Sequence, residues 1–172
     1  MLYKNNDKFL LPSVDTPIYI FVFFALIFSF AKNTNAASEN EILKEIENLI
    51  NAQGIDIFME QAVLNEQHAY PLKKDVIDTI VNVYYIRPSK NKVYTHMLNA
   101  NWREYYSEAN NLALEQVEIL LQAKMKEITI NTICSNKLNL VYLDNKVKIT
   151  HLYRELDGTF IFELNVGEKD CN

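Results

Sequence analysis

An apolar stretch near the N-terminus limits how the rest of this chain can fold. Residues 18–31 form 14 consecutive positions without a charged side chain. A helix that crosses a bilayer needs about 20 apolar residues, so this shorter stretch is typical of a secretory signal sequence. Lys4 and Lys8 precede the stretch, and Thr34 and Ala36 follow it with the small-residue spacing of a signal peptidase site. The sequence therefore predicts an exported protein.

This prediction also sets the domain organisation. We predict a signal peptide over residues 1–36, cleaved near Ala36, and a single domain over residues 37–172. The alternative is an uncleaved segment that anchors the protein in the inner membrane, which would be its only contact with a membrane. The length of the apolar stretch and its flanking residues favour cleavage. No cysteine lies near the junction, which excludes lipid attachment at that place.

The chain has two cysteines, Cys134 and Cys171, and both follow the predicted signal peptide. An even pair in an exported chain predicts one disulfide bond between them. The alternative is that Cys134 is a catalytic nucleophile activated by a histidine. An oxidising compartment disfavours that alternative because thiols there are normally oxidised.

Composition and motif spacing argue against several functional classes. The formal net charge of −5 disfavours binding to nucleic acid, and three glycines are too few for a glycine-rich phosphate or dinucleotide loop. The histidines, His68, His96 and His151, have no second ligand at the spacing that places two ligands on one helix face. We therefore expect structural histidines, no catalytic residues, no metal and no cofactor.

Hydrophobic periodicity predicts an α+β fold. The expected order is an N-terminal helix, an antiparallel hairpin, a long helix and a C-terminal antiparallel hairpin, in a meandering antiparallel sheet. Residues 55–70 fit both an alternating and a helical pattern, so this stretch is left open. The predicted helices span residues 38–53, 108–133 and 136–144, and the predicted strands span residues 80–86, 92–98, 147–155 and 159–166.

Local signals define the ends and faces of these elements. Ser38 and Ser107 are predicted to cap the first and the long helix, and Gly54 is predicted to end the first helix. Every second residue from Phe160 to Val166 is apolar, so one face of the last strand must be covered. The long helix is the expected cover.

The connection between the second strand and the long helix has an unusual composition. Residues 99–106 are predicted to be a loop, and it carries Trp102, Arg103, Tyr105 and Tyr106. Tryptophan, tyrosine and arginine are enriched at protein interfaces, so these four residues are candidates for partner binding. The alternative is that the aromatic side chains belong to the core.

The C-terminal part of the chain carries a recurring arrangement of motifs. The motifs are a helix ending in Thr132-Ile133-Cys134-Ser135-Asn136, a turn with Leu140 to Asp144, the segments Asn145-Lys146-Val147-Lys148-Ile149 and Tyr153-Arg154-Glu155-Leu156-Asp157-Gly158, and a final Cys171. This arrangement resembles small exported proteins of Gram-negative bacteria and, among those with an understood role, the pilotins of type II secretion. Pilotins are lipoproteins that bind a short segment of the outer-membrane secretin and carry it to its membrane. This chain lacks their lipidated cysteine after the signal.

The resemblance implies the fold, a disulfide from the helix end to the C-terminus, and a periplasmic location. We therefore expect a non-enzymatic periplasmic domain that binds another periplasmic or envelope protein, through a sheet edge or through the aromatic connection. The leading hypothesis is a pilotin-like secretion accessory. One alternative is an immunity or inhibitor protein, whose acidic charge would suit a basic toxin. The other is a hydrolase whose histidines and carboxylates meet only in the folded chain.

Overall fold

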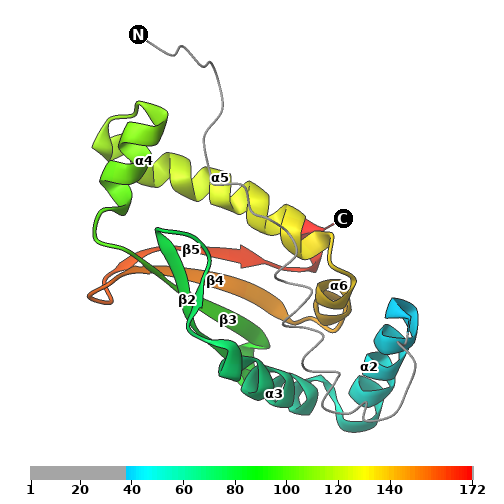
Figure 1. Cartoon of the computed structure of the whole chain (residues 1–172). Helices are drawn as coiled ribbons and strands as arrows, with labels where there is room; N and C mark the ends of the chain where they lie inside the picture. The colour runs from blue at the N-terminus through cyan, green and yellow to red at the C-terminus, as the bar shows by residue number, and fades with distance from the viewer. Residues whose placement is uncertain (1–37, 172) are drawn as a thin grey trace.

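The computed structural model describes residues 38–171, which form an α+β fold with five α-helices and one five-stranded sheet (Figure 1). The predicted signal peptide and its cleavage site lie outside these residues. Within residues 38–171, every helix is too short or too polar to cross a bilayer. The helices are α2 (Glu39–Gln53), α3 (Ile55–Glu66), α4 (Trp102–Asn110), α5 (Leu114–Cys134) and α6 (Lys137–Asp144), with short 3-10 turns η1 (Gln67–Ala69), η2 (Arg87–Ser89) and η3 (Glu168–Asp170).

The strands follow one another in the sheet in the order of the sequence. They are β1 (Leu72–Lys73), β2 (Asp78–Ile86), β3 (Asn91–Leu98), β4 (Lys148–Glu155) and β5 (Phe160–Val166). The predicted α+β class and both predicted hairpins, β2–β3 and β4–β5, are confirmed. The predicted fully antiparallel meander is wrong at one junction, because β3 and β4 are parallel. The helices α4 to α6 form a crossover between them, and parallel neighbours require such a crossover.

The N-terminal helix follows its predicted signals. Ser38 accepts a hydrogen bond from the Glu41 backbone N–H, and the Glu41 side chain accepts one from the Ser38 backbone. Gly54 ends α2 with a φ of 86°, a conformation that side-chain-bearing residues rarely adopt. The stretch that the sequence left open is helix α3 followed by η1.

The predicted long helix is two helices, and the predicted aromatic loop is part of the first. Helix α4 ends at Asn110, and the next residue, Asn111, interrupts the helical path with a positive φ of 53°. Ser107 therefore does not cap a helix; its hydroxyl donates a hydrogen bond to the Leu112 carbonyl in the turn between α4 and α5. The break lets α4 and α5 pack different side chains against the sheet.

All five helices belong to clusters that pack against one face of the sheet. Leu98 of β3 and Leu164 of β5 pack with α4 and α5, whereas Val83 of β2 packs with α3 and α6. Val83 pairs with Tyr94, and Tyr94 lies four residues from Leu98 on the same strand, so these side chains share a face. The core is thus divided into clusters side by side along the sheet.

The last strand deviates from its predicted alternation at one end. Phe162, Leu164 and Val166 are buried, and α5 covers this strand as predicted. Phe160 is 54% exposed because the register shifts between Tyr153 and its neighbour, which inserts one extra residue into β5. The predicted apolar face is therefore one residue shorter than the sequence pattern suggested.

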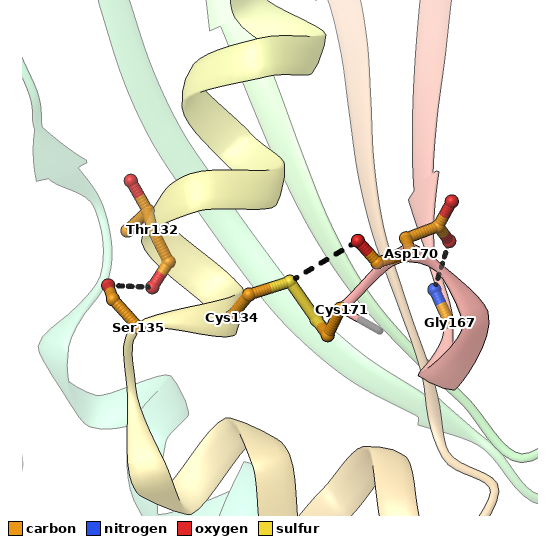
Figure 2. Close-up of a disulfide and its surroundings, with 6 residues drawn as sticks. All are labelled: Thr132, Cys134, Ser135, Gly167, Asp170 and Cys171. Atoms are coloured by element: carbon orange, nitrogen blue, oxygen red, sulfur yellow. Dashed lines mark hydrogen bonds between the residues drawn. A yellow bond between two sulfur atoms is a disulfide. The ribbon is translucent and has the colours of Figure 1, made fainter.

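The predicted disulfide is confirmed between Cys134, at the end of α5, and Cys171 (Figure 2). The two Cα atoms lie 5.2 Å apart, and residues 38–171 contain no free cysteine, which removes Cys134 as a nucleophile. The bridge holds η3 against the helix end, where the Gly167 backbone N–H donates to the Asp170 carboxylate. A bridge that closes a loop of this size stabilises a fold by about 2–4 kcal/mol.

Candidate functional site

The structure separates the four candidate partner-binding residues into two pairs. Trp102 is fully buried and Tyr106 is 4% exposed, because both side chains, four residues apart on α4, point into the core. Tyr105 is 37% exposed and the Arg103 side chain is 40% exposed. Of these four residues, therefore, Arg103 and Tyr105 are the two that can contact a partner directly.

Arg103 connects three elements at this end of the molecule. Its guanidinium donates to Glu155 of β4 at 2.6 Å and to Glu118 of α5 at 3.4 Å, and it lies 4.2 Å from the centre of the Trp102 ring. The Trp102 indole N–H donates to the same Glu155 carboxylate. Partial burial lowers the pKa of Arg103, but the hydrogen bonds and charges of Glu155 and Glu118 raise it more, so Arg103 remains a cation.

Exposed apolar side chains flank this ion cluster. Leu114 lies one helical turn before Glu118 and is 48% exposed, and Leu156 follows Glu155 and is 59% exposed. We call the set Arg103, Tyr105, Leu114 and Leu156 the α4-end surface. It combines a paired cation, a tyrosine and two leucines at the end of the molecule opposite α2 (Figure 1).

A second group of functional side chains lies on the helix-covered face of the sheet. The His96 ring, 3% exposed, places Nδ1 at 2.9 and 2.8 Å from the two carboxylate oxygens of Asp78. Its other nitrogen, Nε2, lies 2.9 Å from Nδ1 of His151. The strands β2, β3 and β4 thus contribute one residue each to a hydrogen-bonded chain, which we call the Asp78–His96–His151 chain.

Aromatic rings hold both histidines in place. His151 stacks on Tyr94 with ring centres 5.0 Å apart, and His96 stacks on Tyr153 at 4.3 Å. Burial, followed by the charges of His96, Lys74 and Lys92, holds the pKa of His151 well below its ordinary value of 6.5. His151 is therefore neutral near pH 7.

A buried ion pair lies beside this chain. The Lys92 ammonium, 2% exposed, lies 2.7 Å from a Glu66 carboxylate oxygen and faces the rings of Tyr94 and Tyr142. Glu66 also accepts a hydrogen bond from the Tyr70 hydroxyl at 2.8 Å. Burial raises the pKa of Glu66, but the charge and hydrogen bond of Lys92 and the hydroxyls of Tyr70 and Tyr94 together lower it more, so the carboxylate is ionised. Because each charge is matched by its partner, we assign no reactive role to Lys92 or Glu66.

The histidine arrangement supplies only part of a catalytic site. An acid, a histidine and a second histidine are in contact, which resembles the base-orienting half of a catalytic triad. However, within residues 38–171 no serine, threonine or cysteine side chain hydrogen-bonds to either ring, and His68 is exposed elsewhere. In the same part of the chain, no group of three or more acidic, histidine or cysteine side chains is placed to hold a metal ion.

Structural histidines were the expectation, and a meeting of histidines with carboxylates was only the alternative, so the members of the Asp78–His96–His151 chain were not predicted. Lys92, Tyr94 and His96 alternate along β3, so polar side chains occupy one face of a strand that the structure packs against helices. That alternation is a signal for a buried polar cluster. The partner His151 could not be assigned, because its position opposite β3 depends on the unexpected parallel pairing with β4.

Comparison with known proteins adds structural neighbours. No protein-family model matches the sequence, and no curated protein matches it. Among solved structures, a Pseudomonas aeruginosa protein described as secreted aligns with a TM-score of 0.53 and 10% identity, over 80% of this chain and 100% of that one. A pilotin of the Vibrio vulnificus type II secretion system aligns with a TM-score of 0.50 and 11% identity, over 75% and 97%. A Vibrio cholerae pilotin aligns with a TM-score of 0.46 and 16% identity, over 76% and 98%.

The first two alignments show a common fold at very low sequence identity. The weak resemblance to pilotins that the sequence motifs indicated is confirmed at the level of fold.

Proposed function

We propose that this protein is a non-enzymatic periplasmic domain that binds an envelope protein as a pilotin-like secretion accessory. One observation carries the proposal: the fold of this chain covers nearly the whole of a type II secretion pilotin. Within residues 38–171 no serine, threonine or cysteine side chain hydrogen-bonds to His96 or His151, which supports a binding role over a hydrolytic one. The partner class that the resemblance implies is a short segment of an outer-membrane secretin.

The α4-end surface is the binding surface that we assign to this function. Tyrosine and arginine are over-represented among residues that dominate binding energy, and Tyr105 and Arg103 are both exposed on α4. The exposed Leu114 lies one turn before Glu118 and Leu156 lies next to Glu155, the two carboxylates that hold Arg103. Arg103 is already held by two carboxylates, so it loses little side-chain freedom when a partner covers it. A peptide with an apolar side chain would fit the leucines, and a basic group on it would suit the net negative charge of Arg103 with Glu118 and Glu155.

Site-specific photocrosslinking in the native host tests the assignment. A photoreactive amino acid at Tyr105 should capture an envelope protein, and the same group at Lys44, exposed on α2 at the opposite end, should not. Leu156→Asp should abolish the Tyr105 crosslink while leaving the circular dichroism spectrum unchanged, because Leu156 is 59% exposed. A secretin among the captured proteins would support the secretion role. Capture of a secreted toxin would favour the immunity alternative, and equal capture from Lys44 would contradict the surface assignment.

Export and cleavage form a separate prediction. We propose that the mature protein begins at Ala37, after removal of the 1–36 signal peptide. The intact mass of protein purified from its host should then match residues 37–172 less two hydrogens, because the Cys134–Cys171 bridge is closed. Reduction should raise that mass by two hydrogens. A full-length mass would instead support the inner-membrane anchor.

A further inference from the structure

The Asp78–His96–His151 chain lies at the junction between the two halves of the sheet. The strands β1 to β3 form one antiparallel half, β4 and β5 form the other, and only the parallel pairing of β3 with β4 joins them. The His96–His151 contact, at 2.9 Å, crosses this junction. It is therefore a side-chain link between the halves, on the buried face.

The geometry limits how many protons the two rings can hold. The Asp78 carboxylate accepts hydrogen bonds, so Nδ1 of His96 must carry a proton. The contact between His96 and His151 requires one N–H and one lone pair, whichever ring donates. The two rings can thus share two or three ring protons with the contact intact. A fourth would place two N–H groups opposite each other across 2.9 Å.

The groups around the Asp78–His96–His151 chain disfavour the binding of a fourth proton by the two rings. Lys74 and Lys92 add positive charge near His151, and Glu66 is already paired with Lys92. The neighbours from the other packed elements are neutral aromatic groups: Tyr94 and Tyr153 stack on the rings, and Tyr106 of α4 lies toward Asp78. Asp78 is the only negative group that contacts the two rings among residues 38–171, and it contacts His96 alone.

We propose that the Asp78–His96–His151 chain is an acid-sensitive latch between the two halves of the sheet. The latch is closed while the rings share at most three protons, and uptake of a fourth breaks the His96–His151 contact. The unfolded chain has no such limit and binds a proton on His151 at the ordinary pKa of 6.5. Below that pH the unfolded state therefore binds more protons than the folded state, and the folding equilibrium constant falls as the pH falls.

Urea unfolding at pH 7.5, 6.5 and 5.5 tests the latch. In the wild-type protein the folding equilibrium constant should fall about tenfold between pH 7.5 and 5.5 through this one group, because each unit below the unfolded pKa contributes a factor of about ten. His151→Gln keeps an amide that can hydrogen-bond to His96 but cannot titrate, so this loss should largely disappear. His68→Gln, at an exposed position, is the matched control and should keep the wild-type loss. Equal pH dependence of His151→Gln and wild type would overturn the proposal.

Nitrogen NMR of the imidazole rings provides a test without any substitution. In the folded wild-type protein at pH 5.5, the His96 and His151 rings together should carry no more than three protons. Two protons on each of the two rings in the folded state, with the signals otherwise unchanged, would overturn the proposal. The chosen pH range stays above the ordinary pKa values of aspartate and glutamate, about 3.9 and 4.3, so the carboxylates contribute little to the measured change.

Discussion

Trp102→Ala should lower the free energy of unfolding by about 3–5 kcal/mol, the usual cost of removing a large buried aromatic side chain. The Trp102 ring is completely buried in a cluster with Leu98, Val117 and Tyr153, so alanine would leave a cavity among β3, β4 and α5. The substitution would also remove the indole N–H that donates to Glu155. Urea unfolding at pH 7.5 measures the change.

Tyr105→Ala is the matched control for Trp102, because it removes an aromatic ring from the same helix at a 37% exposed position. It should cost less than about 1 kcal/mol. Trp102→Phe should lie between the two, since it keeps an aromatic ring in the core but loses the hydrogen bond. An unchanged unfolding free energy for Trp102→Ala would place the ring outside the core. That result would favour the original interpretation of residues 99–106 as a contact surface.

The Trp102 case shows why part of the candidate site escaped prediction. Composition alone made residues 99–106 look like a surface loop, because tryptophan, arginine and tyrosine are typical of interfaces. The spacing of Trp102 and Tyr106, four residues apart, was the available signal for a helix with one buried face. The structure uses that spacing, and so the arginine and the tyrosine between them are exposed while the two flanking aromatic rings are buried.

Elements defined by local chemistry were predicted well, and long-range pairings were not. Ser38 begins α2 through hydrogen bonds, and Gly54 ends it through its backbone conformation. Both effects act within a few residues, so the local sequence is enough to predict them. The cysteine pair followed from compartment chemistry and count. The parallel pairing of β3 with β4 depends instead on the path of three intervening helices, and no local pattern specifies that path. Every functional group that relies on this pairing, the His96–His151 contact first of all, was therefore beyond the sequence argument.

The buried ion pair Glu66–Lys92 should be as sensitive as Trp102, for a different reason. Lys92 is 2% exposed and the Glu66 side chain is 12% exposed, so each charge depends on the other. Glu66→Leu would leave the ammonium buried without a counter-charge. Removing one partner of a buried pair typically costs about 3–5 kcal/mol, and urea unfolding at pH 7.5 should show a loss of that size.

The double variant Glu66→Leu with Lys92→Met distinguishes an unpaired charge from lost packing. Replacing a buried ion pair with apolar residues of similar volume is often neutral or stabilising, so the double variant should recover most of the free energy that Glu66→Leu loses. The four proteins of the cycle then give the coupling energy between the two side chains. A double variant as unstable as Glu66→Leu would contradict the charge argument, and the loss would have to come from the packing of Glu66 against Tyr70 instead. Recovery would mean that the face of β3 beneath α3 tolerates an apolar core, so that stability alone does not require the charges at this position.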